Sequence, residues 1–251
     1  MVTDSPHSSA EKTSADSPSP APARKKAVVV LPSRGRPERL TKALDSVIKN
    51  SSPDLDIVVA IDHDEKDFYP RVEGVTYDIG PTPTTIGVNA KLNRLANKYK
   101  DSYDYFLWVA DDSIILTKKW DKLLIKEISK IRHGISHPHE TTQDIRKLPS
   151  NGTCFDLSIV RTLGYLAPPS LLHLYIDNFW QLIGTELGTL RYTPKVELDH
   201  QHFTNTKSVW DAQYAKTNSQ QRYDRERDMY EVYKNHQLKI DLAKLRSTSF
   251  D

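Results

Sequence analysis

The feature that most constrains the fold is a strand–helix–strand pattern near the amino terminus. Residues 27–31 form a β-branched run, Ala-Val-Val-Val-Leu, which Pro32 ends, and residues 56–61 form a second such run. Between them, residues 38–49 place apolar side chains at helical spacing, and Pro37 suits the first position of a helix. Strands that are apolar on both faces are buried on both faces, so the pattern predicts a βαβ unit in a parallel sheet.

The same alternation continues along the chain. Residues 105–110, Tyr-Phe-Leu-Trp-Val-Ala, form its most apolar run, as is typical of a central strand. Further strands are expected over 74–79 and 190–192, and further helices over 88–98, 119–131, 175–187 and 220–245. Together these elements predict an α/β fold with a Rossmann-like, mostly parallel sheet flanked by helices, in a single domain.

Composition narrows the class of protein further. The chain has 251 residues, enough for a full core. Its mean hydropathy is −0.59, and no apolar run approaches the ~20 residues of a membrane span, so we expect no membrane span. Residues 1–23 lack the apolar centre of a secretory signal, which favours a cytoplasmic protein. A net charge of +2 neither requires nor forbids a polyanionic partner. The single Cys154 excludes an internal disulfide.

Polar residues follow three of the expected strands. Ser33 and Arg34 follow the first, Asp62 the second, and Asp111 with Asp112 the most apolar one. In an open parallel sheet, ligands bind outside the carboxyl ends of the strands. Two adjacent carboxylates repel each other unless a cation or hydrogen bonds compensate, so the pair fits a divalent ion or a polyol hydroxyl. The alternative is a turn or a helix cap, since Asp-Asp-Ser caps a helix well.

The order of these segments resembles a known family. Residues 28–37, the strand that ends at Asp62, the helix 89–94 and the strand 105–112 are similar to the nucleotide-binding half of family-2-like glycosyltransferases of the GT-A fold. Weaker similarity continues to about Tyr214. The resemblance implies an enzyme of the EC 2.4 class, which moves a hexosyl or related sugar from a nucleotide sugar, foremost a UDP-sugar, to a hydroxyl acceptor.

In that family two acidic residues form the DxD motif, one facing the ribose of the donor and the next binding Mn²⁺ or Mg²⁺. By resemblance Asp111 faces the ribose and Asp112 the metal, although Ala110 stands where many members have the first Asp. A divalent ion that spans both phosphates stabilises the negative charge that develops on the leaving diphosphate.

The same resemblance assigns further residues to the donor. Ser33, with Arg34 nearby, and Asp62 are expected to hold the base and the ribose. Lys91 is expected to reach the nucleotide or its phosphates, or alternatively to lie on a solvated helix face. Lys207 stands in a segment that resembles the loop closing over the donor, where it would reach the diphosphate; an ordinary surface loop is the alternative.

The domain boundaries follow from composition and from the resemblance. Residues 1–25 are rich in Ser, Pro, Ala and Thr, a composition that predicts a disordered tail. A GT-A domain is expected over 26–215, with its nucleotide-binding half over 26–118 and its acceptor half over 119–215. Residues 216–251 are expected to form a carboxy-terminal helical extension.

Asp177 is the candidate catalytic base. An inverting transferase needs a group that takes the proton from the acceptor hydroxyl, and Asp177 stands among aromatic residues that desolvate a carboxylate and raise its pKa. Its position resembles that of the acidic catalytic residue of the family, after the Gly-containing acceptor segment 151–153. The alternative for Asp177 is that it caps the helix that follows. For Trp180, the alternative to holding an acceptor or sugar ring is a place in the core.

The histidines divide into two groups. His133, His137 and His139 fall in an expected loop without an acidic partner, so we expect them at the surface. His200 and His202 follow Asp199, where many GT-A enzymes use a late histidine as a metal ligand; extended backbone puts both on one side, and the choice between them stays open. Imidazole beside carboxylates favours Mn²⁺ over Mg²⁺.

The acceptor and two other functions stay open. Small enzymes of this kind occur in phages that glycosylate modified bases, so hydroxymethylated DNA in the host cytoplasm is one candidate acceptor. A sugar-nucleotide nucleotidyltransferase shares this sheet but requires a Gly-rich loop, and residues 33–37 contain one Gly. A non-catalytic nucleic-acid or carbohydrate binder is suggested by Arg34, Arg36 and Arg39. Oligomeric state and inversion or retention of configuration are not decided by the sequence.

Overall fold

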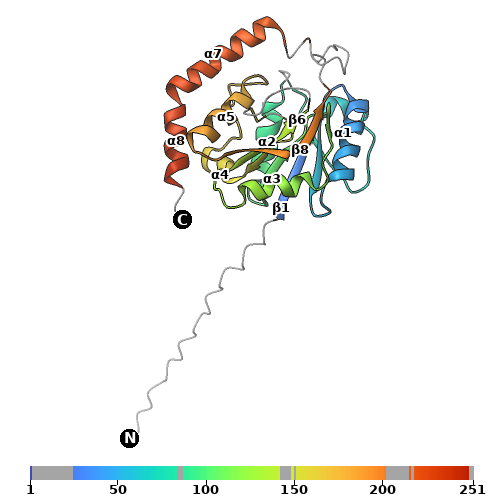
Figure 1. Ribbon diagram of the computed structural model, residues 1–251, viewed down its shortest axis with the longest axis horizontal. Helices are drawn as coiled ribbons and strands as arrows, with labels where there is room; N and C mark the ends of the chain where they lie inside the picture. The colour runs from blue at the N-terminus through green and yellow to red at the C-terminus, as the bar shows by residue number, and fades with distance from the viewer. Residues whose placement is uncertain are drawn as a thin grey trace.

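The computed structural model describes residues 1, 25–83, 87–141, 148–149, 151–201, 215 and 218–248 (Figure 1). The expected tail over 1–25 lies outside the described residues except for its two ends. The strands are β1 (Lys25–Pro32), β2 (Asp56–Asp62), β3 (Thr76–Gly80), β4 (Tyr103–Trp108), β5 (Ser113–Ile115), β6 (Ile135–Glu140), β7 (Cys154–Asp156) and β8 (Leu190–His200). The helices are α1 (Pro37–Asn50), α2 (Asn89–Tyr99), α3 (Trp120–Ile128), α4 (Ser158–Leu163), α5 (Ile176–Glu186), α7 (Gln220–His236) and α8 (Leu238–Ser247), with a 3-10 turn η1 (His63–Glu65).

The strand–helix–strand unit predicted from the sequence is present. β1 and β2 pair in parallel, with Val28 opposite Asp56, and α1 connects them from Pro37 onward. The sheet has the order β3-β2-β1-β4-β7-β6-β8-β5, in which β7 and β5 run antiparallel to their neighbours. The predicted α/β fold with a mostly parallel sheet flanked by helices is therefore confirmed. The carboxyl ends of β1, β2, β4, β6 and β8 all lie at one edge of the sheet.

Alternation along β1 explains why helices cover both faces of the sheet. Val28 and Val30 face one hydrophobic core, whereas Val29 and Leu31 face the other, and all four are fully buried. The first core packs against α2, α4, α5, α7 and α8, and the second against α1 and α3 (Figure 1). The apolar run that predicted a doubly buried strand thus stabilises two layers at once.

The structure differs from the sequence prediction at β6. We expected residues 137–139 in a loop because Pro138 lacks a backbone donor, but the segment is a buried strand parallel to β8. The proline is accommodated because a bulge interrupts the pairing between Pro138 and His139. β8 is also much longer than the strand expected over 190–192. As a result Glu140 and His200, the last residues of these two strands, end at the same edge as β4.

The carboxy-terminal helices are part of the packed structure. Tyr233, Leu242 and Leu245 are buried in the core that also contains α4 and α5. The buried Asp241 accepts hydrogen bonds from the hydroxyls of Tyr165 and Tyr233, the latter at 2.9 Å. α7 and α8 are thus attached by apolar packing and by a buried polar link. Among the helices described, none combines the length and apolar composition that crossing a bilayer requires.

Candidate active site

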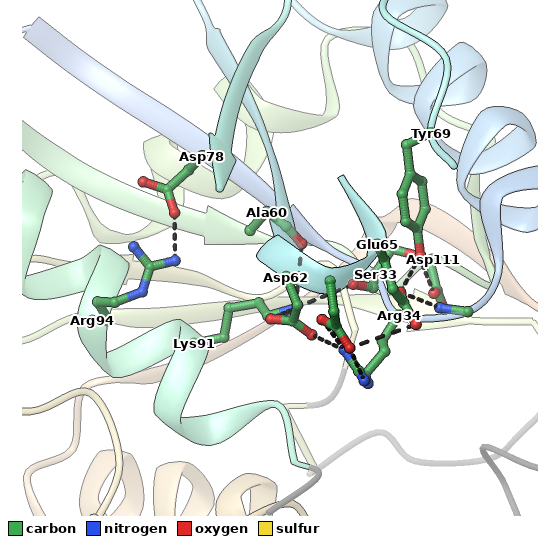
Figure 2. A network of polar contacts seen from close by, with 12 residues as sticks. Ser33, Arg34, Ala60, Asp62, Glu65, Tyr69, Asp78, Lys91, Arg94 and Asp111 are labelled. Carbon is green, nitrogen blue, oxygen red and sulfur yellow. Dashed lines mark hydrogen bonds and ion pairs between the residues drawn. The ribbon is translucent and has the colours of Figure 1, made fainter. Parts of the chain in front are cut away.

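The loop after β1 is fixed at the carboxyl edge of the sheet. The Ser33 backbone N–H donates to the carbonyl of Ala60 on β2 at 3.0 Å. Its buried hydroxyl donates to Asp111 Oδ2 at 2.7 Å and lies 3.1 Å from the Tyr69 hydroxyl (Figure 2). Gly35, at φ +69° in the left-handed region that favours glycine, turns the chain away from the strand. Ser33 therefore links the end of β1 directly to the carboxylates after β4.

Arg34 is held by the acidic turn after β2. Its guanidinium donates two hydrogen bonds to Asp64, at 3.0 and 2.7 Å. It donates a third to Asp62 Oδ2 at 2.9 Å, which Figure 2 shows. The hydrogen bonds from Arg34 lower the pKa of Asp64 to about 2. Glu65 accepts from the Gly35 backbone N–H at 2.7 Å. Arg34 and Asp62, which the resemblance assigns to the same donor site, are thus in direct contact, and the turn at 62–65 holds the whole loop.

Lys91 reaches the same place from the first turn of α2. Its Nζ lies 3.1 Å from Asp62 Oδ1 and donates to the Ser33 carbonyl at 3.1 Å (Figure 2). Burial lowers the pKa of Lys91, and the charge of Asp62 acts in the opposite direction. The alternative of a solvated lysine is therefore wrong, because the amine lies between the ends of β1 and β2.

Asp111 and Asp112 form a buried carboxylate pair in the turn between β4 and β5. Burial raises the pKa of Asp111 to about 6, and the charge of Asp112 adds to this effect. Arg36 Nη1 compensates, lying 3.5 Å from Asp111 Oδ1 and 3.7 Å from Asp112 Oδ2. A strand, β5, follows the pair. The helix-cap half of the alternative is therefore wrong, and the turn half is right, since the pair stands in a turn at the edge of the sheet.

His200 lies between two carboxylates. Its Nε2 is 3.3 Å from Asp112 Oδ1, and its Nδ1 is 3.0 Å from Oε1 of Glu140. Burial alone would lower the pKa of His200, but the hydrogen bonds to Asp112 and Glu140 raise it to about 10. The sequence analysis missed Glu140, because it stands at the end of a segment that we expected to be a loop. His202, the alternative ligand, lies outside the described residues.

The expectation that the other three histidines lie at the surface is wrong for two of them. His133 is buried, and its Nδ1 lies 2.7 Å from the Ser158 hydroxyl. His137 is also buried on β6, where burial lowers its pKa to about 4. His139 is partly buried and lies 2.9 Å from the Tyr192 hydroxyl. Because β6 is an interior strand, its side chains face packed protein.

Asp177 is the second residue of α5. Tyr175, at φ +62°, occupies the N-cap position without a side-chain cap bond, so Asp177 is not the cap of this helix. Burial raises the pKa of the Asp177 carboxyl, while the Asn178 backbone N–H, at 2.9 Å, counteracts this. Trp180 is a core residue whose indole N–H donates to the Leu166 carbonyl at 2.9 Å. Within the described residues, Asp177 is outside the contact network of Asp111 and Asp112.

The segment before α5, here called the pre-α5 loop (residues 168–175), is held from two sides. Asn89, at the start of α2, donates from its side-chain amide to two loop carbonyls at 2.8 and 2.6 Å. Glu226 of α7, fully buried, accepts the consecutive backbone N–H groups of residues 172–174 at 3.1, 2.8 and 2.8 Å. Arg222 balances this carboxylate at 2.6 Å. The sequence analysis missed both Asn89 and Glu226 as holders of this loop.

The pre-α5 loop is held by the same end of α2 that carries Lys91. Asn89 donates to two carbonyls of the loop, and Lys91, two residues further on, contacts Asp62. Within the loop, burial lowers the pKa of His173 to about 4, and the charges of Arg222 and Glu226 also act on it in opposite directions.

The donor atoms at this edge suit a divalent metal. Asp112 offers a carboxylate and His200 an imidazole nitrogen 3.3 Å away, and carboxylate with imidazole suits Mn²⁺ better than Mg²⁺. Over the residues that the structure describes, no group of three or more His, Cys, Asp or Glu side chains is arranged to hold a metal ion by itself. A cation here would take Asp112 and His200 from the chain and complete its ligands with phosphate oxygens and water.

Comparison with solved structures identifies the fold. The mannosyltransferase PcManGT from Pyrobaculum calidifontis, in complex with GDP-Man and Mn²⁺, matches with a TM-score of 0.55 and 12% identity, over 90% of this chain and 74% of that one. Glucosyl-3-phosphoglycerate synthase from Mycobacterium tuberculosis, in complex with Mn²⁺, UDP-glucose and phosphoglyceric acid, matches with a TM-score of 0.54 and 13% identity. The match covers 71% of this chain and 72% of that one. A fragment of TarS from S. aureus in complex with UDP-GlcNAc matches with a TM-score of 0.52 and 12% identity, over 84% of this chain and 73% of that one.

Against a longer TarS chain, the match spans 36% of that chain's length. No family model and no curated protein matches this sequence. At identities of 12 and 13% the likeness shows the fold. The chain has the GT-A fold of glycosyltransferases, as its resemblance predicted.

The contacts join most of the residues expected at the site. The structure connects Ser33, Arg34, Asp62, Lys91, Asp111, Asp112 and His200 by direct contacts, and Figure 2 shows the part of this network around Ser33 and Asp62. Lys207, expected to reach the diphosphate, lies outside the described residues.

Proposed function

We propose that this protein is a metal-assisted glycosyltransferase that moves a sugar from a nucleotide-sugar donor to a hydroxyl acceptor. The observation that carries the proposal is the buried pair Asp111 and Asp112, held at the carboxyl edge of a GT-A sheet by Ser33 and Arg36 and facing His200. The three solved structures compared above contain nucleotide sugars, and two of them contain Mn²⁺.

In this proposal the donor nucleotide lies across the ends of β1, β2 and β4. Asp111 accepts hydrogen bonds from the ribose hydroxyls, beside the Ser33 hydroxyl that already donates to it. Asp62 binds the base or ribose, with Arg34 and Lys91 balancing its charge. Lys207 is proposed to donate to the diphosphate. A UDP-sugar is the donor that we test first.

Asp112 and His200 would hold the metal, with His202 as the alternative histidine. When bound, Mn²⁺ acts as a Lewis acid on the leaving diphosphate. Arg36, at 3.7 Å from Asp112, adds a fixed positive charge at the same place. Asp177 accepts the proton of the acceptor hydroxyl as that oxygen attacks the anomeric carbon, and its raised pKa favours this role. In a retaining reaction Asp177 would orient the acceptor instead.

Thermal unfolding with nucleotide sugars tests the proposal. UDP-, GDP-, ADP- and dTDP-sugars are added with and without Mn²⁺, and one of them should raise the Tm only with the metal. A ligand at 100 times its Kd stabilises the folded state by about 2.7 kcal/mol. The variant Asp112→Asn should lose this response and donor hydrolysis, whereas Asp101→Asn, at an exposed turn, should keep both. A wild-type response that persists in Asp112→Asn would contradict the metal role.

The acceptor is a separate part of the proposal. Hydroxymethylated bases in phage DNA, modified in the host cytoplasm, remain a prediction from the sequence. Binding to DNA releases counterions, so transfer to such DNA should fall steeply between 50 and 200 mM salt. Transfer to a small acceptor should change little. A flat salt response with modified DNA as the substrate would exclude this acceptor class and leave the donor reaction untouched.

A further inference from the structure

Three side chains from three different strand ends are linked by contacts, with His200 between Asp112 and Glu140. Asp112 follows β4, His200 ends β8 and Glu140 ends β6. The Asp112 carboxylate lies 3.3 Å from His200 Nε2, and the Glu140 carboxylate lies 3.0 Å from His200 Nδ1. Glu140 is 3% exposed, so its interaction with the imidazole takes place away from solvent. The imidazole therefore has the buried Glu140 carboxylate on its Nδ1 side and Asp112, a candidate metal ligand, on its Nε2 side.

This arrangement matches a general property of metal-binding histidines. Such a histidine donates its second ring N–H to a carboxylate or carbonyl, which fixes the tautomer and ring orientation and raises the basicity of the ligating nitrogen. A buried carboxylate is stabilised by hydrogen bonds, and Oε1 of Glu140 lies 3.0 Å from Nδ1 of His200. The parallel pairing of β6 and β8, with Glu140 opposite Leu198, places the two side chains within reach.

We propose that Glu140 is a positioning residue that holds His200 with Nδ1–H toward Glu140 and Nε2 toward Asp112, where Nε2 exchanges its proton for a divalent cation. The inference rests on the proposed function in one respect, since it requires Asp112 and His200 to be metal ligands. It adds a residue whose role is to orient the ligand, and it makes Nε2 the metal-binding nitrogen.

Mn²⁺ binding to the protein with UDP present, measured by the loss of the free-ion EPR signal and by calorimetry against a control with UDP alone, tests the role without any sugar transfer. Glu140→Gln retains the size of the side chain but removes the charge, and Glu140→Ala removes the acceptor. Both should weaken Mn²⁺ binding about 10- to 100-fold, the usual effect of losing such a partner. The matched control is Glu197→Gln on β8, three positions from His200 and exposed, which should bind Mn²⁺ as the wild type does. His200→Ala should bind far more weakly than either Glu140 variant.

Nitrogen-15 NMR of the wild-type protein with diamagnetic Zn²⁺ gives a second readout that needs no variant at Glu140. His200 should show a metal-bound Nε2 and a protonated Nδ1. Metal on Nδ1 would overturn the inference, even where a Glu140 variant fails to fold.

The outcomes separate the inference from the proposed function. If the wild type and Glu197→Gln bind Mn²⁺, His200→Ala does not, and both Glu140 variants bind like the wild type, the positioning role is wrong and the metal site stands. If the wild type binds neither Mn²⁺ nor Zn²⁺ in the presence of UDP, the metal part of the proposed function fails, and this inference fails with it.

Discussion

Ser33 and Asp111 stand 78 positions apart in the sequence, yet the Ser33 hydroxyl donates a 2.7 Å hydrogen bond to the Asp111 carboxylate. The contact joins the end of β1 to the end of β4, two strands that pair in parallel. Burial raises the pKa of Asp111 to about 6, and the hydrogen bond from Ser33 acts in the opposite direction because it stabilises the ionised carboxylate. This edge of the candidate site therefore depends on the bond.

Replacing the hydroxyl should destabilise this edge. A hydrogen bond to a charged group contributes about 2 kcal/mol, so Ser33→Ala should lower the free energy of unfolding by about that amount. It should also weaken binding of the nucleotide that stabilises the wild type. Urea unfolding and nucleotide titration measure the two effects. Ser129→Ala, at an exposed position after α3, should change neither, and an unchanged Ser33→Ala would show that the bond contributes nothing.

In the metal-free protein, Arg36 should compensate the negative charge of Asp111 and Asp112 as a bound cation would. The variant Arg36→Gln leaves Asp111 and Asp112 without the nearby guanidinium, so the metal-free protein should lose roughly 1 kcal/mol or more of stability. Mn²⁺ should raise the Tm of this variant more than that of the wild type, because the bound cation replaces the lost charge. The exposed Arg132→Gln is the control. Equal Mn²⁺ shifts in the variant and the wild type would contradict this account.

Stability should decrease in mild acid because of His137. Burial lowers its pKa from 6.5 to about 4 in the folded state, so between these values the unfolded chain binds a proton that the folded protein does not. The contribution of the neutral, buried His137 to the free energy of unfolding is complete above pH 6.5. It is lost as the pH falls toward 4, and the free energy of unfolding then decreases by at most about 1.4 kcal/mol per pH unit. His137→Phe should reduce the slope of unfolding free energy against pH over this window. His236→Phe, at an exposed position, should leave the slope unchanged.

Glu226 should control the local stability of the pre-α5 loop. Glu226→Gln disturbs a buried ion pair and three backbone hydrogen bonds, which should cost about 3 kcal/mol. Hydrogen exchange should accelerate most at the amides of 172–174, because the uncharged amide oxygen of Gln is a weaker acceptor than the carboxylate. Glu231→Gln, exposed on the same helix, is the matched control. Exchange that rises evenly along the chain, without an excess at these amides, would argue against a local role.

The sequence predicted the sheet and the donor-side edge well for a physical reason. The strands β1, β2 and β4 are apolar on both faces, so their runs are unmistakable, and polar residues that follow them must lie at the carboxyl edge. Ser33, Asp62 and the two aspartates after β4 were found in this way.

The residues that the sequence analysis missed depend on tertiary contacts. Glu140 was hidden because Pro138 made β6 resemble a loop, and only the bulge opposite β8 permits the strand. Glu226 belongs to a strongly charged helix, and its burial is decided by the loop that it meets. Local patterns carry no signal for a contact between a carboxylate and backbone N–H groups 54 positions away.

The attachment of Glu226 also sets an order of events during synthesis. Residues 172–174 leave the ribosome well before α7, and chains fold from the amino terminus as they emerge. Until Glu226 arrives, these three N–H groups have water as their acceptor. A nascent chain can therefore assemble β1, β2 and β4, with their carboxylates, while the segment leading into Asp177 is still unfixed. Glu226, translated 52–54 residues later, then fixes the loop.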